Sequence, residues 1–194
     1  MKYVISSPSR TGSTLLHQIL LSTKLSRSDI VHTHNCLLHV DDSENTVLLF
    51  SLRRDLFRSI MSCLIAKRTK FYNYFENVEL PKVESFEIDC SEPWSEFQKQ
   101  YMWHKWYVSS HDMNRPYRQV ETFYVEDFVN NYDLVYNKLG LTKKSNVIPT
   151  LENSYRYQDL VSNHEQCKQV FDQLEKTATF TPIRIPLPEP DSSN

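Results

Sequence analysis

The segment from Ser7 to Thr14, Ser-Pro-Ser-Arg-Thr-Gly-Ser-Thr, combines a basic side chain, several hydroxyl groups and a glycine. It follows a short apolar stretch and leads into another, which predicts a strand, a tight turn and the start of a helix. Backbone N–H groups and the helix dipole favour an anion at such a helix start. We therefore expect an anion-binding loop, and its candidate contacts are Arg10, Thr11, Gly12, Ser13 and Thr14.

This loop differs from the phosphate-binding loop of nucleotide kinases, G-x-x-x-x-G-K-[ST], whose lysine reaches the outer phosphates. No lysine precedes Ser13-Thr14, and no glycine stands five residues before Gly12. A helix capped by Ser or Thr after a strand has a similar sequence, so this segment alone leaves the function open.

A second basic segment begins at Arg54, and Ser62 follows it by eight positions, about two helical turns. Residues 53–70 hold six basic side chains and one acidic one, Asp55. A run of charge is usually a solvated helix face. Here it lies beside the first loop, and two adjacent anion sites suggest a ligand with phosphates at both ends of a nucleoside.

Two histidines, His32 and His34, end the predicted strand of residues 29–34. Strand alternation puts them on one face of the sheet. Imidazoles titrate near neutral pH, so either residue could act as a general base, although either could also be a structural polar residue.

The elements that position these residues follow from the hydrophobic pattern. We predict strands over residues 2–6, 29–34, 46–52 and 120–125, and helices over 13–24, 54–68, 94–110, 132–139 and 163–176. Gly140 is expected to end a helix, and the aromatic residues of 94–110 are interpreted as core. Residues 71–94 are interpreted as a loop or lid insertion within a single domain of residues 1–180, followed by an extended or disordered Pro-rich tail, 181–194.

Strands that alternate with helices predict an α/β fold with three layers, a central parallel sheet covered by helices on both faces. Ligands of such sheets bind beyond the carboxyl ends of the strands. The four polar residues Arg10, His32, His34 and Arg54 all stand at such ends.

With these elements in this order, the sequence resembles the sulfotransferases that use 3′-phosphoadenosine 5′-phosphosulfate (PAPS), which have a P-loop-like fold. Residues 8–15 look like the family's 5′-phosphosulfate loop, with Arg10 as its basic residue. Arg54-Asp55 with Ser62 resembles the 3′-phosphate element. Val31-His32-Thr33-His34 resembles a Lys-Thr-His strand end whose His is the catalytic base. His34 takes the place of that His, and His32 stands where the family has Lys.

Two further segments resemble the family more loosely. Residues 124–128 are similar to a Tyr-Glu-Asp-Leu segment whose Tyr lies near the adenine; Val125 occupies its place, and Tyr124 comes one step earlier. The family's basic, Gly-containing loop near the C-terminus is missing, and residues 153–157 are a candidate substitute through Ser154 and Arg156.

The resemblance implies transfer of a sulfuryl group from PAPS to a hydroxyl or amine, with His34 as the base, Arg10 stabilising the transferring group, and no metal. The acceptor would be a small molecule or glycan, bound near residues 67–94 and the aromatic helix. Two alternatives remain: a small kinase using ATP and Mg²⁺, and a non-catalytic nucleotide-binding module.

Composition limits the partners. The 194 residues carry a net charge of −2, which gives no global field for nucleic acid. Four cysteines without C-x-x-C spacing indicate neither a zinc site nor a redox motif. No apolar run reaches the roughly 20 residues that span a bilayer, and we expect no secretory leader. The sequence predicts a cytoplasmic protein without membrane contact. We interpret its short length and lack of a membrane anchor as typical of a minimal bacterial or viral form of the enzyme.

Overall fold

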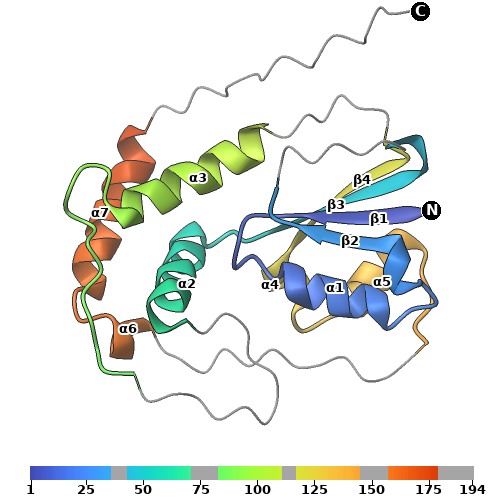
Figure 1. Cartoon of the computed structure of the whole chain (residues 1–194), viewed down its shortest axis with the longest axis horizontal. Helices are drawn as coiled ribbons and strands as arrows, with labels where there is room; N and C mark the ends of the chain where they lie inside the picture. The colour runs from blue at the N-terminus through green and yellow to red at the C-terminus, as the bar shows by residue number, and fades with distance from the viewer. Residues whose placement is uncertain (36–42, 71–82, 111–116, 145–156, 179–194) are drawn as a thin grey trace, which may run out of the picture.

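The computed structural model describes residues 1–35, 43–70, 83–110, 117–144 and 157–178. It confirms the predicted α/β class, because four parallel strands form a central sheet flanked by helices (Figure 1). The strands are β1 (Lys2–Ser6), β2 (Ile30–Thr33), β3 (Thr46–Leu52) and β4 (Gln119–Tyr124). The α-helices are α1 (Ser13–Leu21), α2 (Leu56–Thr69), α3 (Glu96–Ser110), α4 (Val125–Phe128), α5 (Asp133–Leu139), α6 (Tyr157–Leu160) and α7 (His164–Thr177).

The strand order is β2-β1-β3-β4. β1 lies at the centre of three strands, with Ile5 paired to His32 of β2 on one side and to Leu49 of β3 on the other. The chain therefore adds β2 on one side of β1 and then crosses to add β3 on the other side. Parallel sheets leave a ligand crevice at such a reversal, beyond the carboxyl ends of the two strands.

One face of the sheet is covered by α1 and α5. Alternate residues of the strands, such as Tyr3 and Ile5, point to this face and are buried against the apolar sides of both helices. The shared cluster also contains Leu16, Ile19, Phe123, Phe128, Val135 and Tyr136. This core fixes the start of α1, and with it the loop that precedes the helix.

A second helical group, α2, α3 and α7, lies at the carboxyl ends of the strands (Figure 1). Its own core joins Phe57, Phe97, Tyr101 and Phe171. The interpretation of the α3 aromatics as core therefore holds for Phe97 and Tyr101, whereas Trp103 and Trp106 are only half-buried. The Tyr107 hydroxyl lies 2.6 Å from Ser6 Oγ, at the end of β1. This contact connects α3 directly to the sheet.

Local hydrogen bonds explain where some helices begin and end. Asp55 caps α2 by accepting from the Arg58 N–H at 2.9 Å, so the helix starts at Leu56 rather than at Arg54. α1 ends at Leu21 rather than at residue 24, because the Ser22 and Thr23 hydroxyls donate to carbonyls of its last turn. Gly140 ends α5 with φ 62°, as expected.

The short helix α4 was not expected, and Val125, predicted to end a strand, instead begins it. Within the predicted lid, residues 71–82 lie outside the described ranges. The described remainder is anchored, because the Asn163 side chain both accepts from and donates to the backbone of Ile88. The tail, 181–194, also lies outside the described ranges.

Candidate functional site

The loop after β1, which is predicted to bind an anion, has a backbone conformation that is unusual for L residues. Arg10 and Gly12 both adopt left-handed conformations, with φ 65° and 82°, on either side of Thr11. Alternation of left-handed residues in a turn gathers backbone N–H groups into a concave, anion-binding surface. Gly12 also precedes the first turn of α1, and its carbonyl accepts from the Leu16 N–H at 3.0 Å.

Any side chain at position 12 would be strained and would contact Val125 too closely. A Cβ atom there would lie 2.5 Å from Cγ2 of Val125 and 2.8 Å from its Cβ, and the positive φ would strain any L side chain. Val125, which stands where the sequence comparison expected an adenine-contacting tyrosine, packs against this glycine instead. The close approach brings β4 and α4 against the loop.

Neighbouring elements hold the loop in this shape. The Thr11 hydroxyl donates to the carbonyl of Pro8 at 2.8 Å, and the Ser51 hydroxyl, from β3, donates to the carbonyl of Thr11 at 2.7 Å. From α2, the Ser59 hydroxyl donates to the Ser9 carbonyl at 3.2 Å. Side chains of the protein therefore provide the hydrogen-bond donors for these loop carbonyls.

The two predicted anion elements meet at Arg10 and Ser62. Nε of Arg10 donates to Ser62 Oγ at 2.9 Å, across 52 positions of sequence. Ser62 is buried in the second turn of α2. The contact brings the first loop and the helix after β3 into one site.

The histidines lie on the opposite side of the loop, at the β2 edge. Nδ1 of His34 lies 2.8 Å from the Ser7 carbonyl, and Nε2 of His32 lies 2.9 Å from Ser13 Oγ. The His32 ring lies 5.2 Å from that of His34 and 5.7 Å from that of His17, centroid to centroid. Burial, and then the neighbouring His34 and His17, lower the pKa of His32 to about 4, so His32 is neutral at pH 7.

Because a carbonyl oxygen can only accept, the His34 contact has a direction. Nδ1 must carry the proton and donate to the Ser7 carbonyl. In the neutral ring this leaves the lone pair on Nε2. His34 is exposed, so this tautomer presents a proton acceptor to solvent.

Arg54 forms a paired contact with Asp127, at 2.6 and 2.7 Å, and its guanidinium lies 4.3 Å above the Tyr124 ring. Hydrogen bonding to Arg54 lowers the pKa of Asp127. The Arg54 side chain remains 51% exposed. The structure thus brings Arg54 together with Tyr124, while Ser62 contacts Arg10 instead.

The positive charge of residues 53–70 is partly offset by acidic side chains that the fold brings beside them. Arg54 is paired as above, Arg53 lies 3.8 Å from Glu126, and Lys67 pairs with Glu96 of α3. These carboxylates come from distant parts of the chain, so a count of charges along the segment could not include them.

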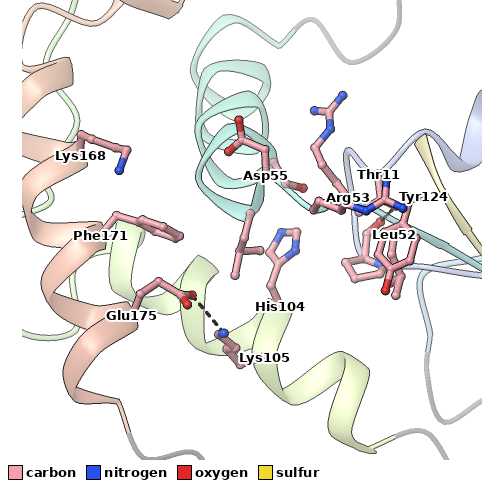
Figure 2. A pocket seen from close by; sticks show the side chains of 14 residues that line it. Thr11, Leu52, Arg53, Asp55, His104, Lys105, Tyr124, Lys168, Phe171 and Glu175 are labelled. Atoms are coloured by element: carbon pink, nitrogen blue, oxygen red, sulfur yellow. Dashed lines mark hydrogen bonds and ion pairs between the residues drawn. The ribbon is translucent and has the colours of Figure 1, made fainter. Parts of the chain in front are cut away.

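A pocket of about 780 Å³ opens between the sheet and the second helical group (Figure 2). It lies at the β1/β3 reversal, where a ligand crevice is expected. The lining comes from the loop (Pro8, Thr11), the end of β3 and start of α2 (Leu52 to Leu56, Ser59), Tyr124, α3 (His104, Lys105) and α7 (Lys168, Phe171, Glu175). Of the described residues predicted for the site, Thr11, Arg54 and Tyr124 line the pocket. The others do not line it: Arg10, Gly12, Ser13, Thr14, His32, His34 and Ser62.

Sequence reasoning missed the far wall of this pocket. His104 is 3% exposed, and its Nε2 has no hydrogen-bond partner in the part of the chain that the structure describes. Burial lowers the pKa of His104 to about 4. The aromatic helix was expected to form core and to lie near the acceptor, but His104 itself was not among the predicted site residues.

Ser154 and Arg156, the candidates for the missing C-terminal loop, lie outside the described residues. Thr14 is half-buried in the first turn of α1.

The described residues contain no group of three or more His, Cys, Asp or Glu able to hold a metal ion. Within the same ranges, every helix is too short or too polar to cross a membrane.

Comparisons of the chain with protein-family models, with curated proteins and with solved structures return no match. The function must therefore be inferred from the chain's own residues.

Proposed function

We propose that the protein is a sulfotransferase that moves a sulfuryl group from PAPS to a hydroxyl or amine of an acceptor. The observation that carries the proposal is the contact between Arg10 and Ser62. It unites an anion-binding loop with the helix of the second basic element. A donor that bears a 5′-phosphosulfate and a 3′-phosphate requires two neighbouring anion sites, and the contact supports their being neighbours.

The residues present fit such a donor. The left-handed turn at Arg10 and Gly12 gathers N–H groups, and any Cβ at position 12 would collide with Val125. The N–H groups of 11–14 and the Arg10 guanidinium would hold the 5′ end. Arg54 and Ser62 would hold the 3′-phosphate, which requires Arg54 to share its guanidinium between that phosphate and Asp127.

When bound, PAPS supplies the activated sulfuryl group. The loop N–H groups and Arg10 would stabilise the negative charge that develops during transfer. They would do so with little rearrangement, because hydrogen bonds from Ser51 and Ser59 already hold the loop. Arginine suits this role since it stays charged and binds oxyanions through two hydrogen bonds.

His34 is the base that accepts the acceptor's proton. Its Nδ1–H is directed to the Ser7 carbonyl, which leaves Nε2 exposed as the proton acceptor. His32 is better suited to positioning, because its Nε2 is engaged with Ser13 Oγ and its pKa is lowered to about 4. The tautomer of His34, which leaves its Nε2 exposed, therefore makes His34 a better candidate than His32 for the general base.

Calorimetry tests the donor class. Adenosine 3′,5′-bisphosphate, the desulfated product, should bind more tightly than ATP with Mg²⁺, and Arg54→Ala should weaken that binding. Lys24→Ala, which removes an exposed charge beyond α1, is the matched control and should have no effect. Preference for ATP with Mg²⁺ would overturn the proposal in favour of a kinase. Donor binding without sulfation of any acceptor would leave a nucleotide-binding module.

A further inference from the structure

The pocket has two chemically different walls (Figure 2). Thr11, Arg53 and Tyr124 lie on the sheet side, where Arg53 and Arg54 give the lining two cationic side chains that suit the phosphates of the proposed donor. On the other side, His104 from α3 and Phe171 from α7 point into the pocket. The far wall therefore presents an imidazole and an aromatic ring.

The cations of the far wall are already paired. Lys105 Nζ lies 3.0 Å from Glu175, and Lys168 pairs with Asp172 along α7. His104 is itself neutral at pH 7, because burial holds its pKa at about 4. This wall consequently offers little attraction for a phosphate.

His104 needs a partner that the described residues do not provide. A buried polar nitrogen without a hydrogen bond is destabilising and is rare in native proteins. Its Nε2 is such an atom, in a side chain 3% exposed that lines the pocket. A ligand seated in the pocket can provide the missing hydrogen bond.

A flat heteroaromatic group matches this wall best. It has apolar faces for the surfaces of Leu56 and Phe171, and polar edge atoms for an imidazole. The pocket volume of about 780 Å³ is within the range of small-molecule and cofactor sites. In a nucleotide whose phosphates lie at the loop and at Arg54, the base is the group left to reach this wall.

We propose that His104 hydrogen-bonds the purine base of the nucleotide donor, which lies between α2, α3 and α7. This inference rests on the proposed function for the identity of the donor. It assigns base recognition to α3 and α7, which the sequence motifs do not include.

The test is calorimetric binding of adenosine 3′,5′-bisphosphate and of the corresponding abasic 3′,5′-bisphosphate. His104→Phe keeps a ring but removes the hydrogen bond, and it should weaken binding of the adenosine ligand about tenfold. Binding of the abasic ligand should not change. The matched control is His164→Phe, at a half-buried histidine of α7 outside the pocket, and it should leave both affinities unaltered.

A second variant, His104→Gln, restores a donor and an acceptor and should recover most of the affinity. It also keeps the test decisive if His104→Phe does not fold. An unchanged affinity in both variants, or an equal loss for both ligands, would overturn the role of His104 while leaving the proposed function intact. Failure of the wild-type protein to bind adenosine 3′,5′-bisphosphate would instead overturn the proposed function, and this inference with it.

Discussion

Nε of Arg10 donates a hydrogen bond to Ser62 Oγ at 2.9 Å. Arg10 belongs to the loop after β1, and Ser62 belongs to α2, which follows β3. Since β1 and β3 are neighbours in the sheet, the elements that follow them meet at one edge. The contact links the two elements that we propose to bind the anionic groups of the donor.

Replacing Ser62 with Ala should therefore affect Arg10. Loss of the hydrogen bond removes the contact that orients the guanidinium, so Ser62→Ala and Arg10→Ala should not be additive. We expect a coupling energy of about 1 kcal/mol for binding of adenosine 3′,5′-bisphosphate, measured by a calorimetric double-mutant cycle. Additive losses would mean that the two side chains contact the ligand independently.

Gly12→Ala should destabilise the fold strongly. The positive φ costs about 1–2 kcal/mol for an L residue, and the Cβ lies 2.5 Å from Val125, which adds overpacking of about 1–3 kcal/mol. Gly140→Ala is the matched control, because it has a similar φ but open space around its Cβ. Urea unfolding should give a larger loss at position 12. Equal losses would show that the contact with Val125 relaxes without cost.

His34→Ala should abolish sulfation while leaving donor binding within about twofold. The reason is that His34 contacts the loop through a backbone carbonyl and lies outside the pocket. Activity with a simple hydroxyl acceptor and calorimetry with adenosine 3′,5′-bisphosphate separate the two effects. If His32→Ala abolishes turnover and His34→Ala does not, His32 is the base.

Asp127→Asn and Arg54→Ala should change donor binding in opposite directions. Asp127 occupies the Arg54 guanidinium through two hydrogen bonds, so its carboxylate competes with a 3′-phosphate. We expect Asp127→Asn to tighten binding of adenosine 3′,5′-bisphosphate several-fold and Arg54→Ala to weaken it. AMP, which lacks the 3′-phosphate, should respond to neither change. Weaker binding in Asp127→Asn would mean that the carboxylate positions Arg54.

Stability should fall as the pH is lowered from about 7 to 4. The unfolded chain protonates His104 near its ordinary pKa of 6.5, whereas burial lowers the pKa to about 4 in the folded state. The unfolded state thus binds the proton first, and the effect approaches about 3 kcal/mol near pH 4. His104→Phe should remove the share of this slope that His104 contributes, while the share of His32, whose pKa is also lowered to about 4, remains. An unchanged slope in His104→Phe would contradict the buried neutral state.

The strands were predictable from sequence because their signals are local. Val47 to Phe50 form an apolar run that needs burial on both faces, and β3 has the bounds that this run predicts. The turn at Gly12 was recognisable for a related reason, since few residues other than glycine tolerate its conformation.

The far wall of the pocket depends instead on packing between distant segments. His104 and Phe171 are 67 positions apart in the numbering, and they line one pocket only because α3 packs against α7. Likewise, nothing in the sequence around Arg54 indicated that the fold pairs its guanidinium with Asp127, 73 positions away. Hydrophobic periodicity indicates that a residue is buried, but it does not indicate which partners it has.

The Ser51 and Ser59 hydroxyls, from β3 and α2, donate hydrogen bonds to carbonyls of the loop. The protein's own side chains therefore fix the loop backbone, and the proposed anion ligand would not need to order it. In the proposed complex little conformational entropy of the loop would be lost on association, so affinity would reflect the contacts between ligand and loop. Replacement of Ser51 or Ser59 would leave the contacts between loop and ligand in place but would let the loop backbone sample other shapes. Productive capture of the ligand would then be slower, whereas its release would not be faster.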